Sequence, residues 1–278
     1  MNNILIFGMT ENPGGVESFL MSYIRKINHG NFKFGFLCNS HDKIAYEDEL
    51  ISYGCEIYHI TARSKDYKKY KREMQQFFKE NASQYDTIWV NVCSLANIDY
   101  LKYAKKYGIK RRIIHSHNSM NMDSKLRGLL HAYNKRHIDK YATDFWACSN
   151  EAARFFFLKK EIKSKNFKII KNAIDTKRFL FNEKSREKIR KQLNLEDKHV
   201  YIQVGRLHKQ KNPMFSIEIF NEILKKDENA IIIFVGTGEL KETLLKRTKE
   251  LKMEKYVYFL GVRDDINDLI SASDVFML

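Results

Sequence analysis

The feature that most constrains the fold is a repeated alternation of short apolar segments with longer segments of helical periodicity. The apolar segments are NILIFG, KFGFLC, EIYHI, TIWVNV, RRIIHS and DFWAC, all between residues 3 and 148. Several are apolar on both faces, which is typical of parallel strands that helices cover on either side. Between the first two, GGVESFLMSYIRKI places apolar side chains at i, i+3, i+4, i+7, i+8 and i+11, which predicts a helix.

The same alternation starts again in the last third of the chain. VYIQVG, AIIIFVG and YVYFLG predict strands, and helices are expected at 213–227, 239–251 and 265–271, before the strand-like DVFML. We therefore expect an α/β protein with two Rossmann-like, doubly wound domains, residues 1–175 and 176–278. Their join lies near the charged segment SREKIRKQL and is located to within about ten residues.

Composition excludes several classes of protein. With 44% hydrophobic residues the chain can bury a core, so it is not a disordered protein. The cysteines Cys38, Cys55, Cys93 and Cys148 lie in or beside apolar segments without a CxxC pair, so we expect reduced, buried thiols in a cytoplasmic protein. No apolar segment is long enough to cross a membrane, and MNNILIFG lacks the basic start of a signal peptide.

The net charge of +15 is concentrated in residues 1–172, which hold 29 Lys and Arg against 17 Asp and Glu. Such an excess marks either a solvated lysine-rich surface or one that meets a polyanion or an anionic membrane. In SKDYKKYKREMQQFFK, an apolar stripe of Tyr67, Tyr70, Met74 and Phe77 is surrounded by cations. We favour a surface helix packed on its own sheet, with membrane contact on the inner face of the plasma membrane as the alternative.

Ligands of doubly wound sheets bind beyond the carboxyl ends of the strands, where loops enter helices. At the first such junction, Gly14 and Gly15 precede a helix. Paired glycines let the backbone pass close to a ligand, and the start of a helix offers unpaired N–H groups to an anion. The pattern is not a dinucleotide fingerprint, because no GxGxxG is present.

A second junction, YIQVGRLHKQKNP, places three cations between a strand and a helix. The strand ends at Gly205, the cations Arg206, Lys209 and Lys211 follow, and the pair 212–213 (Asn-Pro) is a favourable helix start. For Arg206 and Lys211 we predict an anion site, because the positive end of the helix dipole lies beside them. For Lys209 we favour a solvated side chain.

Two further features stand at strand ends. FVGTGELKE supplies Gly236 and Gly238, which could border a nucleotide. In RRIIHSHNS, His115 and His117 lie two residues apart and could share a face as a metal pair, although no third ligand is spaced to join them. A histidine that hydrogen-bonds a substrate is the favoured interpretation, and a structural histidine comes next.

Taken in order, seven segments resemble glycosyltransferase family 4, the retaining sugar-nucleotide-dependent enzymes of GT-B architecture. They are GGVESFL, IIHSHNS, ACSNEAARFFF, IIKNAIDTKRF, VGRLHKQKNPMFSIEIF, VGTGEL and VYFLGVRDDINDLISASDVFML. Within that family the chain looks most like the transferases of bacterial capsular polysaccharide and exopolysaccharide assembly.

The resemblance implies roles for the residues at the junctions. Arg206 and Lys211 would hold the diphosphate of a nucleotide-sugar donor, and His117 would face the donor sugar. The backbone near Val262 would line the base pocket. The resemblance thus implies catalytic roles for His117, Arg206 and Lys211, and donor-binding roles for Gly14, Gly15, Asn118, Gly205, Gly236, Gly238, Val262 and Arg263.

The reaction implied is transfer of a glycosyl group, from a UDP-sugar by preference, to a glycan or a lipid-linked saccharide. No metal or other cofactor is implied, because cations and helix starts would stabilise the departing diphosphate. The family continues beyond DVFML into a segment with two glutamates that contact the donor. We therefore expect a C-terminally truncated chain with an incomplete second domain.

Three alternatives are kept. A GT-B-like sugar-nucleotide epimerase would share the nucleotide site but would need no acceptor. A binding protein without activity would keep the fold alone. From another class, a basic nucleic-acid-binding protein would use the charge of the first half, but no such module is recognisable, so nucleic acid is not an expected partner.

Overall fold

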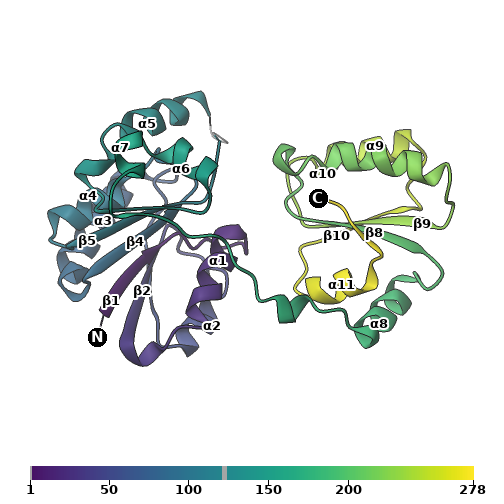
Figure 1. The fold of residues 1–278 in the computed structure, drawn as a ribbon, viewed down its shortest axis with the longest axis horizontal. Coiled ribbons are helices and arrows are strands. Elements are labelled where there is room, and N and C mark those ends of the chain that lie inside the picture. The colour runs from purple at the N-terminus through teal and green to yellow at the C-terminus, as the bar shows by residue number, and fades with distance from the viewer. Residues whose placement is uncertain (1, 121–123) are drawn as a thin grey trace. The chain divides into compact units, whose positions relative to one another are not determined.

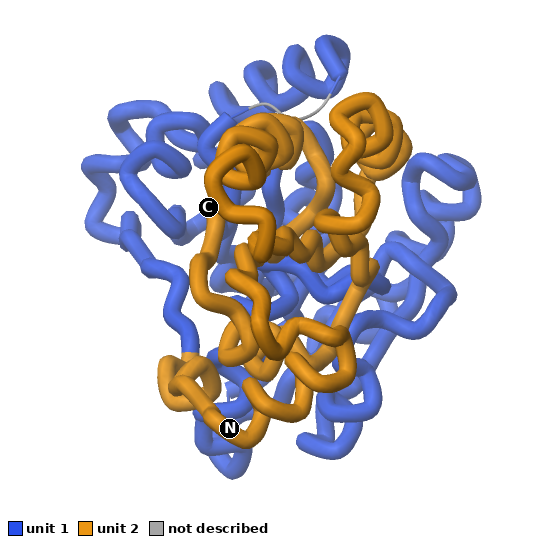
Figure 2. Tube along the Cα trace, turned by 90° about the vertical axis from the view of Figure 1, so that its right-hand side faces the viewer, with its two compact units in different colours: residues 1–174 blue, residues 175–278 orange. Residues whose placement is uncertain are grey.

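The computed structural model describes residues 2–120 and 124–278. It divides the chain into two compact units, Met1–Ile174 (unit 1) and Asp175–Leu278 (unit 2), which Figure 2 distinguishes by colour. The division falls one residue before the predicted join. Each unit consists of a parallel sheet with helices on both faces, which confirms the expected α/β class.

Unit 1 contains a seven-stranded parallel sheet in the order β3-β2-β1-β4-β5-β6-β7 (Figure 1). Its strands are β1 (Asn2–Phe7), β2 (Phe32–Cys38), β3 (Glu56–His59), β4 (Thr87–Val92), β5 (Arg111–Ser116), β6 (Asp144–Ala147) and β7 (Phe167–Ile169). Its helices are α1 (Gly15–Ile24), α2 (Glu47–Ser52), α3 (Tyr67–Asn81), α4 (Asp99–Lys106), α5 (Lys125–Lys135), α6 (Asn150–Phe156) and α7 (Lys159–Ile162). The strand order reverses between β1 and β4, which is the switch point where sheets of this type bind ligands.

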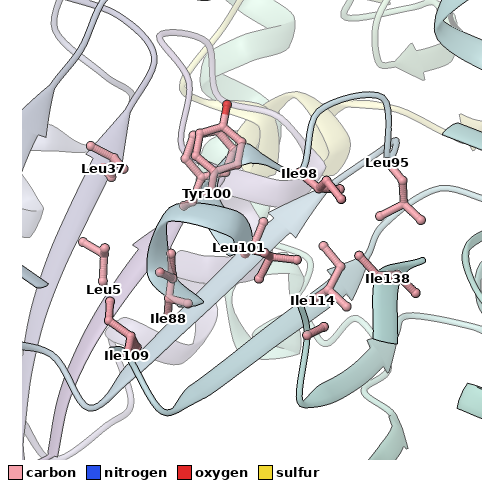
Figure 3. Packing of buried hydrophobic residues seen from close by; sticks show 14 of the residues in the cluster. Leu5, Leu37, Ile88, Leu95, Ile98, Tyr100, Leu101, Ile109, Ile114 and Ile138 are labelled. Atoms are coloured by element: carbon pink, nitrogen blue, oxygen red, sulfur yellow. The ribbon is translucent and has the colours of Figure 1, made fainter. Parts of the chain in front are cut away.

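The two faces of this sheet bury separate cores because alternate side chains of each strand point to opposite sides. Leu5 of β1 packs with residues of α3, α4 and α6, and Figure 3 shows part of this cluster with Ile88, Leu101 and Ile114. The next residue, Ile6, packs on the other face with residues of α1 and α2. Both faces of β1 are therefore covered, as its uninterrupted apolar sequence predicted.

Unit 2 contains a four-stranded parallel sheet in the order β10-β9-β8-β11. Its strands are β8 (His199–Val204), β9 (Ala230–Val235), β10 (Val257–Gly261) and β11 (Val275–Phe276), and its helices are α8 (Glu183–Leu193), α9 (Pro213–Leu224), α10 (Lys241–Glu250) and α11 (Ile266–Ala272). The ends of the three helices predicted in this unit are confirmed to within three residues. Two apolar clusters cover the two faces of the sheet.

The apolar stripe of α3 belongs to the core of unit 1. Tyr70, Met74 and Phe77 are buried against the sheet, and only Tyr67 of the stripe is exposed. The side chain of Asp66 accepts a hydrogen bond from the backbone N–H of Lys69 at 2.9 Å and so caps the helix. The favoured interpretation of this segment is confirmed, and its stripe is not available to a membrane.

Across the described residues, none of the helices combines the length and the apolarity that a membrane span requires. Of the cysteines, Cys38 and Cys55 are buried, and burial raises the pKa of the Cys38 thiol to about 12 and that of Cys55 to about 11. Cys93 is exposed and Cys148 is half-buried, so the expectation of four buried thiols is wrong for these two residues. Cys93 follows directly on the end of β4, where the chain leaves the sheet.

Candidate functional site

Three loops meet at the carboxyl ends of the strands of unit 2. They follow β8, β9 and β10, and hydrogen bonds between backbone groups join them. The bonds run from Gly205 N to Val235 O at 2.9 Å, from Leu207 N to Thr237 O at 2.9 Å, from Leu240 N to Leu207 O at 3.0 Å and from Gly236 N to Gly261 O at 2.7 Å. The backbone of this edge therefore holds its shape without a ligand.

Gly236 and Gly238 are required by the close approach of these loops. Gly236 has a φ of +128°, and a Cβ atom there would lie 2.2 Å from the carbonyl oxygen of Gly205. A Cβ atom on Gly238 would lie 2.4 Å from the carbonyl oxygen of Leu207. Packing alone thus accounts for both glycines, and their contact with a donor stays a prediction.

The cations predicted to bind an anion lie on the first of these loops. Arg206 and Lys211 are exposed, and the methylene groups of Lys211 pack over Gly205. Buried Gln203 donates a hydrogen bond from Nε2 to the backbone carbonyl of Lys211 at 2.8 Å, which fixes the turn. In the part of the chain that the structure describes, neither cation forms an ion pair, whereas neighbouring His208 lies 3.5 Å from Glu239.

The helix beside these cations starts at the predicted residue, but without the predicted side-chain cap. Asn212 is the N-cap residue of α9 and Pro213 is its first helical residue, yet the Asn212 side chain makes no capping hydrogen bond. Instead, Asn212 adopts a left-handed conformation (φ 46°, ψ 46°), which turns the chain into the helix. The start of α9 therefore has no side-chain cap, and its partial positive charge adds to that of Lys211.

Val262 and Arg263 follow β10. Val262 is exposed, and Arg263 makes a bidentate ion pair with Asp265, from Nε at 2.8 Å and from its terminal nitrogen at 2.6 Å. This pair lowers the pKa of the Asp265 carboxyl. Because its side chain is occupied by Asp265, Arg263 presents its backbone at this edge.

In unit 1 the candidate site lies at the switch point between β1 and β4. Gly8, which the sequence analysis did not single out, has a φ of +137° directly after β1. A Cβ atom there would lie 2.6 Å from the backbone oxygen of Asn91, so glycine allows the two strand ends to approach. Asn91 itself is buried at the end of β4.

Asn91 orients His117. Its amide nitrogen points toward the carbonyl oxygens of Phe7 and Trp89, at 3.4 and 3.3 Å, so its Oδ1 faces Nε2 of His117 at 3.0 Å. The histidine must then donate from Nε2, which leaves Nδ1 as a hydrogen-bond acceptor. Burial lowers the pKa of His117 to about 4, so the ring is neutral at physiological pH.

His115 differs from His117 in its surroundings. It is fully buried among Phe19, Trp89 and Trp146, and burial together with His117 lowers its pKa to about 2. Its two ring nitrogens have no hydrogen-bond partner within the described residues. Among those same residues, no group of three or more His, Cys, Asp or Glu side chains is placed to hold a metal ion.

The glycine pair at the start of α1 is arranged around a buried carboxylate. Glu17 accepts hydrogen bonds from the backbone N–H of Thr10 at 3.1 Å and from its hydroxyl at 2.6 Å. A Cβ atom on Gly14 would lie 2.8 Å from Glu17 Oε2, whereas one on Gly15 would meet nothing within 4 Å. Gly14 therefore makes room for Glu17, and Gly15 leaves open space at the first residue of the helix.

Within unit 1 the structure brings the predicted residues to one edge of the sheet. The ring of Phe19, one turn into α1, lies 4.9 Å from that of His117 between centroids. Asn118 follows, and its side chain bonds to the backbone of Met120 and of Ser119 at 3.0 and 2.9 Å. The contacts of Asn118 stabilise its own loop.

Sequence reasoning missed three residues of this edge, Gly8, Glu17 and Asn91. Two of them carried a readable signal, since Asn91 is a polar residue in an apolar strand and Gly8 ends the first strand. Within unit 2, Gly205, Arg206 and Lys211 lie on one loop, which the loop of Gly236 and Gly238 borders. The loop of Val262 borders the latter in turn.

Comparison with known proteins identifies the chemistry that goes with this fold. Residues 185–278 match the family "Glycosyl transferases group 1". The "Putative glycosyltransferase EpsF" of Bacillus subtilis is 24% identical over 274 residues, which cover 96% of this chain and 70% of that protein. The UDP-Gal:alpha-D-GlcNAc-diphosphoundecaprenol alpha-1,3-galactosyltransferase of Escherichia coli is 32% identical over 114 residues, 40% of this chain and 30% of that protein.

Solved structures share the fold. HepE of Anabaena, in complex with UDP and glucose, superimposes with a TM-score of 0.76 at 20% identity over 98% of this chain and 73% of that one. A putative UDP-N-acetylglucosamine 2-epimerase of Listeria monocytogenes also shares the fold, with a TM-score of 0.63 at 13% identity, over 99% of this chain and 73% of that one. The fold is therefore shared with a putative epimerase as well, whereas the family match and the relatives favour a transferase. The chain therefore has a GT-B fold, and its residues 185–278 match the group 1 family of glycosyl transferases, which supports a transferase enzyme.

Proposed function

We propose that the protein transfers a sugar from a UDP-sugar, with retention of anomeric configuration, to a glycan or lipid-linked saccharide of a cell-surface polysaccharide. The observation that carries the proposal is the pair of exposed cations, Arg206 and Lys211, beside the uncapped start of α9. Two exposed cations that form no ion pair within the described residues, next to the positive end of a helix, favour a dianionic ligand. A nucleoside diphosphate has that charge.

The names of similar proteins support the choice of donor and acceptor. HepE binds UDP and glucose, and the Escherichia coli relative is named for a UDP-sugar donor and a diphosphoundecaprenol acceptor. We extend the same donor chemistry to this chain and place its reaction in the cytoplasm. An acceptor linked to a lipid would bring the enzyme to the inner face of the membrane.

In this proposal the cations of unit 2 stabilise the departing diphosphate. The guanidinium of Arg206 can donate two parallel hydrogen bonds to phosphate oxygens, and Lys211 adds a point charge. Both stand on a loop that backbone hydrogen bonds already hold, so little reorganisation is needed during the reaction. The charge that a metal ion supplies in other transferases would come from these side chains, and the leaving phosphate would help to deprotonate the acceptor hydroxyl.

His117 would act as a neutral hydrogen-bond acceptor for a hydroxyl of the donor sugar. Its Nε2 is engaged by Asn91, its Nδ1 is left to accept, and its pKa of about 4 keeps the ring uncharged. Asn91 is then a positioning residue, because it holds His117 in one tautomer. Gly14, Gly15 and the start of α1 would keep the donor-binding role that the resemblance implies for them.

The alternatives are less well supported. An epimerase of this fold would convert its sugar nucleotide without an acceptor, so product analysis separates the two activities. A nucleic-acid-binding role would rest on charge alone, and the cations of unit 1 are spread over several helices.

The experiment that tests the proposal is thermal and chemical unfolding of the chain with UDP, GDP, ADP and their sugar conjugates. A nucleotide at a hundredfold excess over its dissociation constant should raise the free energy of unfolding by about 2.7 kcal/mol. Arg206→Ala should abolish this gain, whereas Lys209→Ala, on the same turn, should keep it. Stabilisation by no nucleotide, or equal loss in both variants, would contradict the proposed donor site.

Transfer itself is measured with a radiolabelled UDP-sugar and a lipid-linked saccharide. Arg206→Ala should raise the activation free energy of transfer by about 3 kcal/mol, which corresponds to the loss of one preorganised donor. The anomeric configuration of the product, read by NMR, decides between retention and inversion. Isomerised sugar nucleotide without transfer would assign the chain to the epimerases instead.

A further inference from the structure

Helix α5 exposes its apolar side chains and buries polar ones, which is the reverse of a usual amphipathic helix. Leu126, Leu129, Leu130 and Tyr133 all point to solvent, with exposed fractions of 68%, 69%, 39% and 62%. At about 100° per residue these four side chains fall within an arc of about 100°, so they form one continuous stripe. We call these four residues the α5 stripe. The helix forms the outer end of unit 1 at the top of Figure 1.

The inward face of α5 is held by polar groups instead. His131 is buried, with Nδ1 3.0 Å from the backbone N–H of Leu95 and Nε2 3.1 Å from the carbonyl oxygen of Phe155. Buried Asn134 donates to the carbonyl oxygen of Leu95 at 2.7 Å, and Lys135 donates to that of Arg154 at 2.6 Å. These bonds fix the orientation of the helix, so the α5 stripe cannot turn inward.

Cations border the stripe on both sides. On the helical projection Lys125 and Arg136 lie beyond Leu129, and Arg127 lies beyond Leu130. Between residues 124 and 140 the only acidic residue is Asp139, which forms an ion pair with Lys160. An open, largely apolar hollow beside the helix is lined by Leu129, Ala132 and Phe155 together with Lys125 and Lys135.

We propose that the α5 stripe is the surface by which the protein docks on an anionic phospholipid bilayer. Exposed leucines between flanking cations are the pattern of a helix that lies in the plane of the interface, with its apolar face among the acyl chains and its cations at the headgroups. At 11 residues α5 is too short to cross a bilayer. Charge selects this occupant over a second copy of the chain, because two such faces would bring their cations together.

The net charge of unit 1 acts in the same direction. Residues 1–172 carry 29 Lys and Arg against 17 Asp and Glu, so the unit that bears the stripe is attracted to an anionic surface before contact is made. The proposed docking surface does not depend on whether the donor site binds a nucleotide. Its test therefore stands apart from the nucleotide experiments.

The test is co-sedimentation of the full chain with vesicles, either of phosphatidylcholine alone or of equal parts phosphatidylcholine and phosphatidylglycerol. We expect binding to the anionic vesicles at about 50 mM NaCl and weaker binding at about 500 mM. Leu126→Gln with Leu129→Gln should reduce the partition coefficient about tenfold or more, because the apolar contact is lost. Lys125→Gln with Arg136→Gln should reduce the partition coefficient in the anionic vesicles, and it should not make binding more sensitive to salt.

Matched controls come from the same unit. Ile51 of α2 is an equally apolar residue with an exposed fraction of 55%, and Ile51→Gln should leave binding unchanged. Lys110→Gln with Lys165→Gln removes two exposed cations elsewhere and should change binding less than the α5 pair. All these positions are exposed, and glutamine favours helices at those in α2 and α5, so the variants should unfold at the temperature of the parent chain.

Several outcomes would overturn the proposal. One is the absence of sedimentation with anionic vesicles, and another is equal binding to phosphatidylcholine alone. Retention of binding in the leucine variant would assign the contact to charge without the stripe. A dimer seen by analytical ultracentrifugation that the leucine variant loses, without vesicle binding, would make the stripe an interface between copies.

Discussion

The two glycines at the start of α1 allow an effect on folding and an effect on ligand binding to be told apart with single alanine substitutions. Gly15 is the first helical residue, and a Cβ atom placed on it meets no atom within 4 Å. Gly15→Ala should therefore not destabilise the fold. Because alanine restricts the unfolded chain, we expect the free energy of unfolding to rise by about 0.4–1 kcal/mol.

The neighbouring position predicts the opposite result. A Cβ atom on Gly14 would lie 2.8 Å from Oε2 of Glu17, a buried carboxylate that accepts two hydrogen bonds from Thr10. Gly14→Ala must displace that carboxylate, and hydrogen bonds to a charged group contribute about 1.5–3 kcal/mol. We expect a loss of stability of that order.

The assay joins urea unfolding, followed by circular dichroism, with calorimetric titration of UDP. If the diphosphate lies against the start of α1, the methyl group of Gly15→Ala fills the space it needs, and UDP affinity should fall at least about tenfold, or about 1.4 kcal/mol. A stable Gly15→Ala protein with unchanged UDP affinity would refute the placement of the ligand. A destabilised one would refute the structural argument.

Three further predictions concern stability. The ring of His115 stays neutral in the folded state, with a pKa of about 2. In the unfolded chain the same ring takes up a proton at about pH 6.5, so the free energy of unfolding should decrease as the pH falls below that value. His115→Phe should lower the slope of unfolding free energy against pH by about one proton between pH 6 and 4, and an unchanged slope would contradict the burial. Asp274 accepts hydrogen bonds from Arg186 and Arg190 at 2.6 Å each and from Val200 N at 2.8 Å. Asp274→Ala should lower the free energy of unfolding in urea by about 3–5 kcal/mol, because the buried guanidinium of Arg190 keeps only carbonyl acceptors and loses its counter-charge. Gly236→Ala should destabilise unit 2 with or without UDP, since its Cβ would collide with Gly205, and stability equal to the parent would show that the loops are not closely packed.

The fold was largely predictable because its strands are buried on both faces. Such strands are uninterrupted apolar runs, and β1, β4 and β9 were recognised from them. The strand β7 was missed because it has only three residues, with exposed Lys168 at its centre. Tertiary contacts rather than its own sequence hold it at the edge of the sheet.

Periodicity predicts a helix but does not tell which of its faces is inside. For α3 the usual assumption is correct, and its apolar stripe is buried. For α5 the same assumption would bury Leu126 and Leu129 and expose His131, which is the reverse of the structure. The difference lies in partners such as Leu95, which are distant in sequence.

The charged residues of the site could be predicted from the sequence, but the residues that position them could not. Arg206 and Lys211 stand at a strand end, where their position alone indicates an anion site. Asn91 could not be linked to His117, because that contact joins β4 to the end of β5 across the sheet. The need for Gly236 is equally hidden, since it depends on how closely two loops approach.

The attachment of α5 by a ring, an amide and an ammonium group uncouples its outer surface from the folding of the protein. In most amphipathic helices the leucines pack in the core. A substitution that changes the apolar face of such a helix therefore also changes the stability of the fold. Here Leu126, Leu129 and Tyr133 can be exchanged while His131 and Asn134 keep the helix in place. Single substitutions can therefore weaken or abolish binding through the α5 stripe without changing the free energy of unfolding of the chain.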